Sequence, residues 1–219
     1  MDQLLAQLPA KPVLITGELV TADPKASQKT RLHVSILFSF GPHRDMARYT
    51  IRDAFGGELE QVTVTRKKDA APQVEYAQGN PLVTAPAPSL LSPIQDTAAS
   101  WLDLTLSFLW WRTGAIIGKQ EVKEQPCYVL DVNAPSGASG NYGHVRLWID
   151  VRVSMLLQAE AYDDRGTLVR RIAIKSFKKI DEQWMIKDLE IQDFAAARRT
   201  ILRVQDVQPV PVETPARSE

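Results

Sequence analysis

The stretch LLQAEAYDDRGTLVRRIAIKSF, residues 156–177, predicts two antiparallel strands joined by a tight turn. Apolar and polar residues alternate on both sides of the turn, and this period of two is typical of a strand with one buried face. The turn carries Asp163, Asp164 and Gly166. Because glycine takes a positive φ without steric cost, Gly166 suits a tight reversal. The stretch therefore indicates an antiparallel β protein.

The same alternation extends through most of the chain. In RLHVSILFSF, residues 31–40, one face carries Leu32, Val34, Ile36, Phe38 and Phe40. From Val145 to about Val207 the pattern predicts one continuous meander. The other predicted strands are PVLITGELV (12–20), ARYTIRD (47–53), ELEQVTVTRK (58–67), QVEYA (73–77), AIIGKQEV (115–122), CYVLDV (127–132), HVRLWID (144–150), QWMIKDLEI (183–191) and RTILRVQDV (199–207).

One segment, WLDLTLSFLWW at 101–111, breaks this pattern and predicts a helix. Ser100 and Asp103 have the spacing of a capping box at its start. A helix over 101–111 would be apolar nearly all round, and such a helix is buried on most sides. We therefore expect it to cover a curved sheet, after an irregular crossing at 81–100. One of its faces would carry Trp101, Leu104, Phe108 and Trp111.

Composition limits the class of protein. The chain has 219 residues, 44% of them hydrophobic, and a formal net charge of zero. The balanced charge argues against nucleic acid as a partner, because phosphate binding needs a basic surplus. No segment has the roughly 20 apolar residues of a membrane span. The single cysteine, Cys127, excludes an internal disulfide and fits either a reducing compartment or a periplasm. The length fits one domain at 1–208 with a flexible tail at 209–219.

Catalytic and metal-binding patterns are missing from the sequence. His33, His43 and His144 do not have metal-ligand spacing, and Cys127 has no histidine partner pattern. The Gly/Ser run at 135–143 reads as a hairpin loop, since it lacks the lysine of a phosphate loop. We therefore expect no catalytic residues, no metal and no cofactor, and a protein that is not an enzyme.

The second half of the chain resembles the bacterial outer-membrane lipoprotein-sorting proteins, the LolA-like family. The resemblance covers about residues 90–208. Its central part, DLTLSFLWW to CYVLDV, carries Asp103, Leu104, Phe108, Leu109, Cys127, Tyr128 and Leu130. Its later part carries Trp148, Asp150, Tyr162, Asp164, Gly166, Phe177, Asp181, Trp184, Thr200 and Asp206. The chain departs from the pattern at Glu182, where the family often has glycine, and has no proline between Asp150 and Leu156.

This resemblance implies an incomplete antiparallel β-barrel of about 11 strands. A few short helices would cover its concave apolar face. It also implies a periplasmic carrier that binds lipid acyl chains or lipoproteins and moves them toward the outer membrane, with a signal peptide already removed. Envelope membrane proteins are further expected partners. The candidate residues for the apolar cavity or its lid are Trp101, Leu104, Phe108, Trp111, Val34, Ile36, Phe38 and Phe40.

Two alternatives stay open at this stage. The same apolar residues could fill the core against one another, in a sensor or scaffold module that transports nothing. An envelope hydrolase is a third hypothesis, and it would need Glu58 or His144 beside a second titratable group with a perturbed pKa. The sequence does not distinguish a hollow interior from a filled one.

Overall fold

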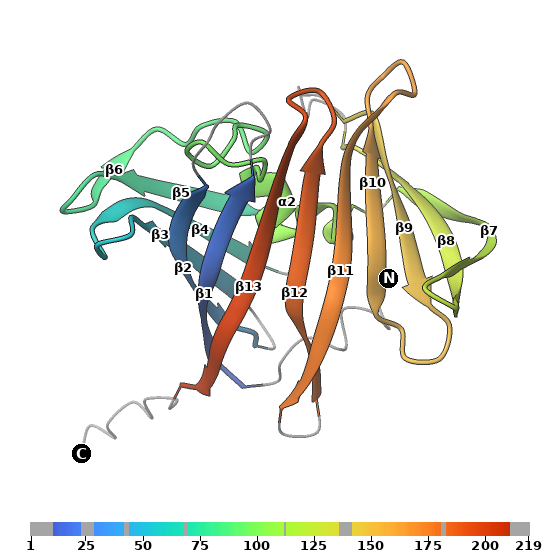
Figure 1. The fold of residues 1–219 in the computed structure, drawn as a ribbon, viewed down its shortest axis with the longest axis horizontal. Coiled ribbons are helices and arrows are strands. Elements are labelled where there is room, and N and C mark those ends of the chain that lie inside the picture. The colour runs from blue at the N-terminus through green and yellow to red at the C-terminus, as the bar shows by residue number, and fades with distance from the viewer. Residues whose placement is uncertain are drawn as a thin grey trace. The chain divides into compact units, whose positions relative to one another are not determined.

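The computed structural model describes residues 11–22, 29–41, 44–67, 70–111, 113–135, 142–180 and 183–210. Thirteen strands and two short helices span them (Figure 1). The strands are β1 (Val13–Ala22), β2 (Thr30–Ser39), β3 (Arg44–Arg52), β4 (Glu58–Lys67), β5 (Gln73–Gln78), β6 (Val83–Ala85), β7 (Gly114–Val122), β8 (Gln125–Asn133), β9 (His144–Asp150), β10 (Leu156–Tyr162), β11 (Leu168–Ile180), β12 (Gln183–Asp193) and β13 (Arg198–Pro209). The helices are α2 (Trp101–Thr105) and the 3₁₀ helix η1 (Ser107–Trp110).

All strands belong to one sheet in the order β6-β5-β4-β3-β2-β1-β13-β12-β11-β10-β9-β8-β7. Neighbours that follow each other in the chain pair antiparallel. Within the described part of the chain, the edge strands β6 and β7 do not pair with each other, so the sheet is not closed into a barrel. The predicted class, an incomplete antiparallel barrel with few helices, is confirmed.

Every predicted strand is present, and the meander predicted from Val145 onward is confirmed as β9 to β13. The sheet has 13 strands rather than about 11. One addition is β6, which lies in the stretch predicted to be irregular and is only three residues long. A strand this short shows too little alternation for the period of two to be visible. The flexible tail predicted at 209–219 falls almost entirely outside the described residues.

The chain divides into two compact units. Unit 1 comprises 18–32 and 88–203 and holds α2, η1 and β7 to β12. Unit 2 comprises 33–87 with 9–17 and 204–219, and it holds β3 to β6. Each unit is described by itself below. No helix in the described ranges has both the length and the apolar content needed to cross a membrane.

The turn between β10 and β11 has the predicted form. Gly166 has a φ of +77°, and the backbone N–H of Asp163 donates to the carbonyl of Thr167 at 3.0 Å. The Asp163 carboxylate accepts from the backbone N–H groups of Arg165 and Thr167. The aspartate therefore has the local hydrogen-bonding role expected in a turn.

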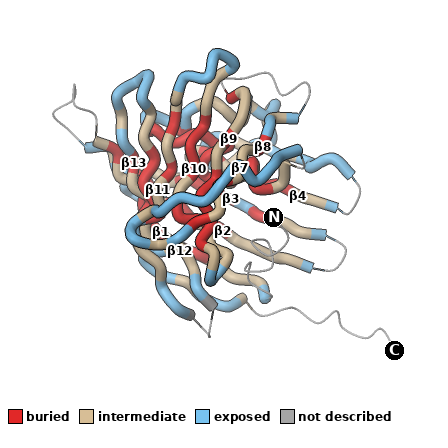
Figure 2. Tube along the Cα trace, turned by 90° about the vertical axis from the view of Figure 1, so that its right-hand side faces the viewer, coloured by how far each residue is buried: buried red, intermediate tan, exposed pale blue. Residues whose placement is uncertain are grey.

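The core of unit 1 lies on one face of β9, β10 and β11. Alternate residues of these strands are buried, as the period of two requires. They are Val145, Leu147, Ala159, Ala161, Ile172 and Ile174. The buried stretches of the three strands are visible in Figure 2.

The opposite face of these strands carries a row of charges. Asp131 pairs in register with Arg146, Arg146 with Glu160, and Glu160 with Arg171. Arg146 binds Asp131 at 2.8 Å, and Arg171 binds Glu160 at 2.8 Å. Opposite charges on neighbouring strands stabilise each pairing modestly. This face is therefore the polar side of the sheet.

The single helix predicted for 101–111 is wrong in its length. The capping box is present, but α2 ends at Thr105, and Leu106 has a left-handed φ of +49°. The hydroxyl of Thr105 donates to the carbonyl of Trp101 at 2.7 Å and lies 2.6 Å from the hydroxyl of Ser107. Hydroxyl side chains bond to the backbone in this way in competition with helix continuation. The chain then resumes as η1.

Candidate ligand-binding site

The covering segment, residues 100–111, lies against the apolar face of unit 1 and centres on a buried carboxylate. Asp103 is 1% exposed. Its Oδ2 accepts from the backbone N–H of Ser100 at 3.0 Å and from the Ser100 hydroxyl at 2.7 Å. Its Oδ1 accepts from the hydroxyl of Tyr142 at 2.8 Å. The carboxylate thus caps the start of α2 and also binds Tyr142, which lies two residues before β9.

Arg170 of β11 joins the covering segment to the sheet. Its Nε lies 3.5 Å from Asp103, and its Nη2 lies 3.0 Å from Asp193 of β12. Its Nη1 also donates to the carbonyl of Ala98. This guanidinium is 90% buried and is shared by two carboxylates, one on the covering segment and one on the sheet.

Burial dominates the electrostatics of this network. Desolvation raises the pKa of Asp103 above its usual 3.8, although the nearby Arg170 and the hydrogen bonds from Ser100 and Tyr142 lower it. Desolvation and the adjacent Asp103 raise the pKa of Tyr142 far above its usual range, so its hydroxyl stays protonated and donates. The network therefore joins the covering segment to Arg170 and Tyr142 by polar contacts inside an apolar interface.

The chain just before α2 is anchored separately. The backbone N–H of Ala98 donates to the hydroxyl of Thr200 at 2.7 Å, and that hydroxyl lies 2.8 Å from Thr21. Thr200 is fully buried. The covering segment therefore starts from a fixed point on β1 and β13.

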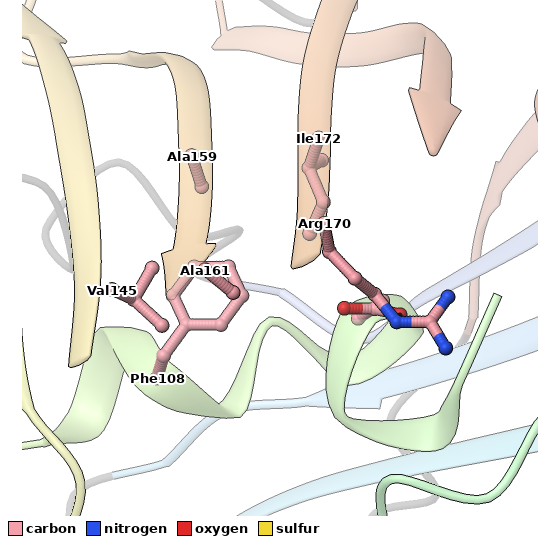
Figure 3. Close-up of a pocket in the computed structure, with 7 residues that line it drawn as sticks. Phe108, Val145, Ala159, Ala161, Arg170 and Ile172 are labelled. Carbon is pink, nitrogen blue, oxygen red and sulfur yellow. Dashed lines mark ion pairs between the residues drawn. The ribbon is translucent and has the colours of Figure 1, made fainter. Parts of the chain in front are cut away.

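The ring of Phe108 is the apolar contact between η1 and the sheet. A narrow space under it is lined by Val145, Ala159, Ala161 and Ile172, with Asp103 and Arg170 at one end (Figure 3). No part of this space admits a water molecule. Phe108 is 1% exposed. The interface is closed in this state, and the small side chains of the two alanines are what leave the space.

Three of the four candidate residues on the covering segment are buried, and their role as cavity or lid residues stays a prediction. Trp101, Leu104 and Phe108 are buried at 0%, 6% and 1% exposure. Trp111 follows η1 and is only half-buried, with its ring 6.4 Å from that of Phe108 in an edge-on contact. The indole N–H of Trp101 is buried and has no hydrogen-bond partner among the described residues. All four residues belong to unit 1.

The other four candidates lie in unit 2. Val34 and Ile36 are buried, whereas Phe38 and Phe40 are half-buried and stack at 5.5 Å between ring centroids. The edge of Tyr49 packs on Phe38 at 6.0 Å. Their predicted position as the floor beneath the covering segment stays a prediction.

The hydrolase hypothesis required His144 or Glu58 beside a second titratable group with a perturbed pKa, and His144 lies beside one such group, Tyr162. His144 stacks on the ring of Tyr162 at 4.7 Å, and Glu58 binds Arg52 at 3.1 Å. Tyr162 has its pKa raised to about 12, first by burial and then by its bond to Glu160. His43 lies outside the described residues. In the ranges that the structure describes, no group of three or more His, Cys, Asp or Glu is placed to hold a metal.

This fold has close structural relatives. A DUF1329 family protein from Desulfovibrio piger matches with a TM-score of 0.79 and 13% identity, covering 95% of this chain and 90% of that one. A protein described as an outer-membrane lipoprotein-sorting domain, from Vibrio parahaemolyticus, matches with a TM-score of 0.76 and 13% identity, at 95% and 89% coverage. A LolA superfamily protein from Nitrosomonas europaea matches with a TM-score of 0.70 and 15% identity, covering 96% of this chain and 94% of that one.

These likenesses define the class: the protein has a LolA-like fold. Residues 87–213, more than half of the chain, match the model of a family described as "Uncharacterized protein". The chain therefore belongs to that family. A comparison with curated protein sequences gives no match.

Sequence reasoning missed the partners of Asp103. Arg170 shares the parity of Ile172 and Ile174 in LVRRIAI, so the alternation itself places a cation on the apolar face. That position was the available signal, because a buried charge is retained only when it is paired. The partners of Arg170 are Asp103, which lies 67 residues earlier in the sequence, and Asp193, which lies 23 residues later. No local sequence pattern identifies partners at such distances.

Proposed function

We propose that the protein binds acyl chains of lipids or lipoproteins beneath the covering segment and carries them within the bacterial envelope. The observation that supports this most directly is the apolar interface between η1 and β9 to β11, where Phe108 faces Ala159 and Ala161. The fold is shared with a protein described as a lipoprotein-sorting domain and with a LolA superfamily protein.

In this proposal the closed interface is the ligand-free state. An incoming acyl chain displaces the ring of Phe108, whose exposure costs about 1.5–3 kcal/mol. Each buried CH₂ group of the ligand contributes about 0.8 kcal/mol. About two to four methylene groups therefore offset the exposure of the ring. An acyl chain of a membrane lipid is several times longer, so binding is favourable even after the interface opens.

The Arg170 guanidinium is shared between Asp103 and Asp193, and this sharing allows the covering segment to move away from the sheet and return. Removing one partner of a buried ion pair is strongly destabilising when the other charge is left alone. Arg170 keeps Asp193 at 3.0 Å when Asp103 moves away with the covering segment. Asp103 keeps the hydrogen bonds from Ser100, since both residues belong to that segment. Opening therefore leaves neither charge without a partner, and the ligand shifts the population toward the open state.

The test is ligand uptake by delipidated protein. Native mass spectrometry and titration with a fluorescent fatty acid should show one bound acyl ligand or lipopeptide per chain. The substitution Ala161→Leu fills the space that faces Phe108 and should weaken uptake about tenfold, since overpacking a site costs roughly 1–3 kcal/mol.

The matched control is Ala173→Leu. Ala173 lies on β11 between the buried Ile172 and Ile174, with its side chain on the opposite face, in register with Gln158. The control variant should bind like the wild type. Equal uptake by both variants would place the ligand elsewhere, and no uptake by the wild type would refute the carrier.

The closed interface also favours a second candidate, a sensor or docking module that carries no ligand. The observation behind it is that the space under Phe108 admits no water molecule. This candidate requires that delipidated protein binds neither fatty acid nor lipopeptide at concentrations where the carrier would be saturated. The uptake experiment therefore separates the two.

A further inference from the structure

The two edges of the sheet differ greatly in length. The edge strand β6 has three residues, whereas β7 at the other edge has nine. A long edge presents a row of backbone N–H and C=O groups that can pair with another strand, and short edges avoid this. Among the residues that the structure describes, one edge of the sheet is therefore short, and the other edge has no strand paired to it.

The strand β7 is also largely exposed to solvent. Eight of its nine residues are exposed. Ile116 and Ile117 are 64% and 50% exposed, which places two large apolar side chains next to each other on the edge. A bulge at this point interrupts the pairing with β8, and from Gly118 to Val122 the strand is regular. This regular part is the segment that another strand could extend.

The two charged residues of this regular part, Lys119 and Glu121, could pair with the same two residues of a second copy. Lys119 and Glu121 flank Gln120 and lie on the same face of the strand. The side chain of Gln120 is directed to the other face, where it accepts from the indole N–H of Trp148 at 2.9 Å. An antiparallel pairing of β7 with a second β7, centred on Gln120, would set each Lys119 opposite Glu121 of the other copy.

We propose that β7 is a homodimer interface, in which two copies of this chain join their sheets edge to edge through a twofold axis at Gln120. Isologous pairing of this kind is the commonest symmetry of oligomers. In this register the paired segment runs from Gly118 to Val122 of each copy, and the exposed Ile116 and Ile117 lie just beyond its end, next to the β7–β8 turn of the second copy. The partner is a second copy because a self-paired strand sets each lysine opposite a glutamate, whose charge complements it.

The test is the association constant of the full chain, measured by analytical ultracentrifugation over a wide concentration range. Wild-type protein should dimerise, and moderate salt should weaken the dimer. Glu121→Lys turns two attractive pairs into two repulsive ones and should weaken association about tenfold or more. Lys119→Glu should do the same. The double variant Lys119→Glu with Glu121→Lys restores both pairs and should dimerise again.

Mixing the two single variants gives the sharpest outcome. One chain then carries two glutamates and the other two lysines, so a mixture should form heterodimers although each variant alone is monomeric. Glu124→Lys is the matched control, because it makes the same charge change at an exposed residue of the β7–β8 turn, outside the paired segment, and it should leave association unchanged. A wild type that stays monomeric at its highest soluble concentration would overturn the proposal. So would single variants that dimerise as the wild type does.

Discussion

Replacing Phe108 by alanine tests whether the covering segment is held by apolar contact with the sheet. The ring is 1% exposed and fills the space lined by Val145, Ala159, Ala161 and Ile172. Losing the burial of a phenylalanine side chain costs about 1.5–3 kcal/mol, and the cavity left behind adds to this. We therefore expect Phe108→Ala to destabilise the protein by about 3–5 kcal/mol. For a chain of this size the melting temperature should fall by roughly 6–20 °C.

The chain supplies a matched control for this experiment. Phe55→Ala makes the same chemical change at a turn residue that is 98% exposed, and it should change stability by less than about 0.5 kcal/mol. Urea and thermal unfolding can be followed by tryptophan fluorescence, since Trp111 contacts Phe108 at 6.4 Å between ring centroids. If both variants unfold at the same midpoint, the segment is not packed on the sheet, and the argument for a closed interface fails.

Four further substitutions probe the buried network and two glycine positions. Ser100→Ala removes the cap of α2 and a hydroxyl bonded to Asp103, so it should cost about 1 kcal/mol by urea unfolding, and an unchanged midpoint would contradict the capping role. Gly166→Ala should cost about 1–2 kcal/mol because of its φ of +77°, whereas Gly118→Ala, which also meets no atom within 4 Å, should not destabilise. Burial raises the folded-state pKa of Asp103, so the contribution of its carboxyl is full below about pH 3.8 and declines as the pH rises through that raised pKa. The stability of the wild type relative to Asp103→Asn should therefore fall as the pH rises from about 4, and a relative stability that grows with pH would show that Arg170 outweighs desolvation.

The period of two was sufficient to predict strands such as β2 and β8, because each of them buries alternate residues. It also predicted the turn at Gly166, where only residues within the turn decide the conformation. The short strand β6 escaped prediction, since three residues give no period. The break at Leu106 escaped as well, because the helical pattern of 101–111 contains no glycine or proline that would mark it.

The candidate site was predicted only in part. The burial of Trp101, Leu104 and Phe108 could be predicted because they belong to a segment that is almost entirely apolar, whereas the strands alternate apolar and polar residues. The width of the space beneath them depends on how side chains from β9, β10 and β11 meet, and composition does not determine that. The pairing of Arg170 with Asp103 and Asp193 likewise joins residues that are far apart in sequence.

The row of charges from Asp131 to Arg171 has a consequence for how this fold can diversify. A slip of one residue between any two of these strands would bring the charged side chains out of alignment and turn them to the wrong side of the sheet. Strand alignment is therefore specified from the solvent side, by groups that never meet the interior. Substitutions among the inward-facing alanines, valines and isoleucines can then reshape the interior while the strands keep their partners.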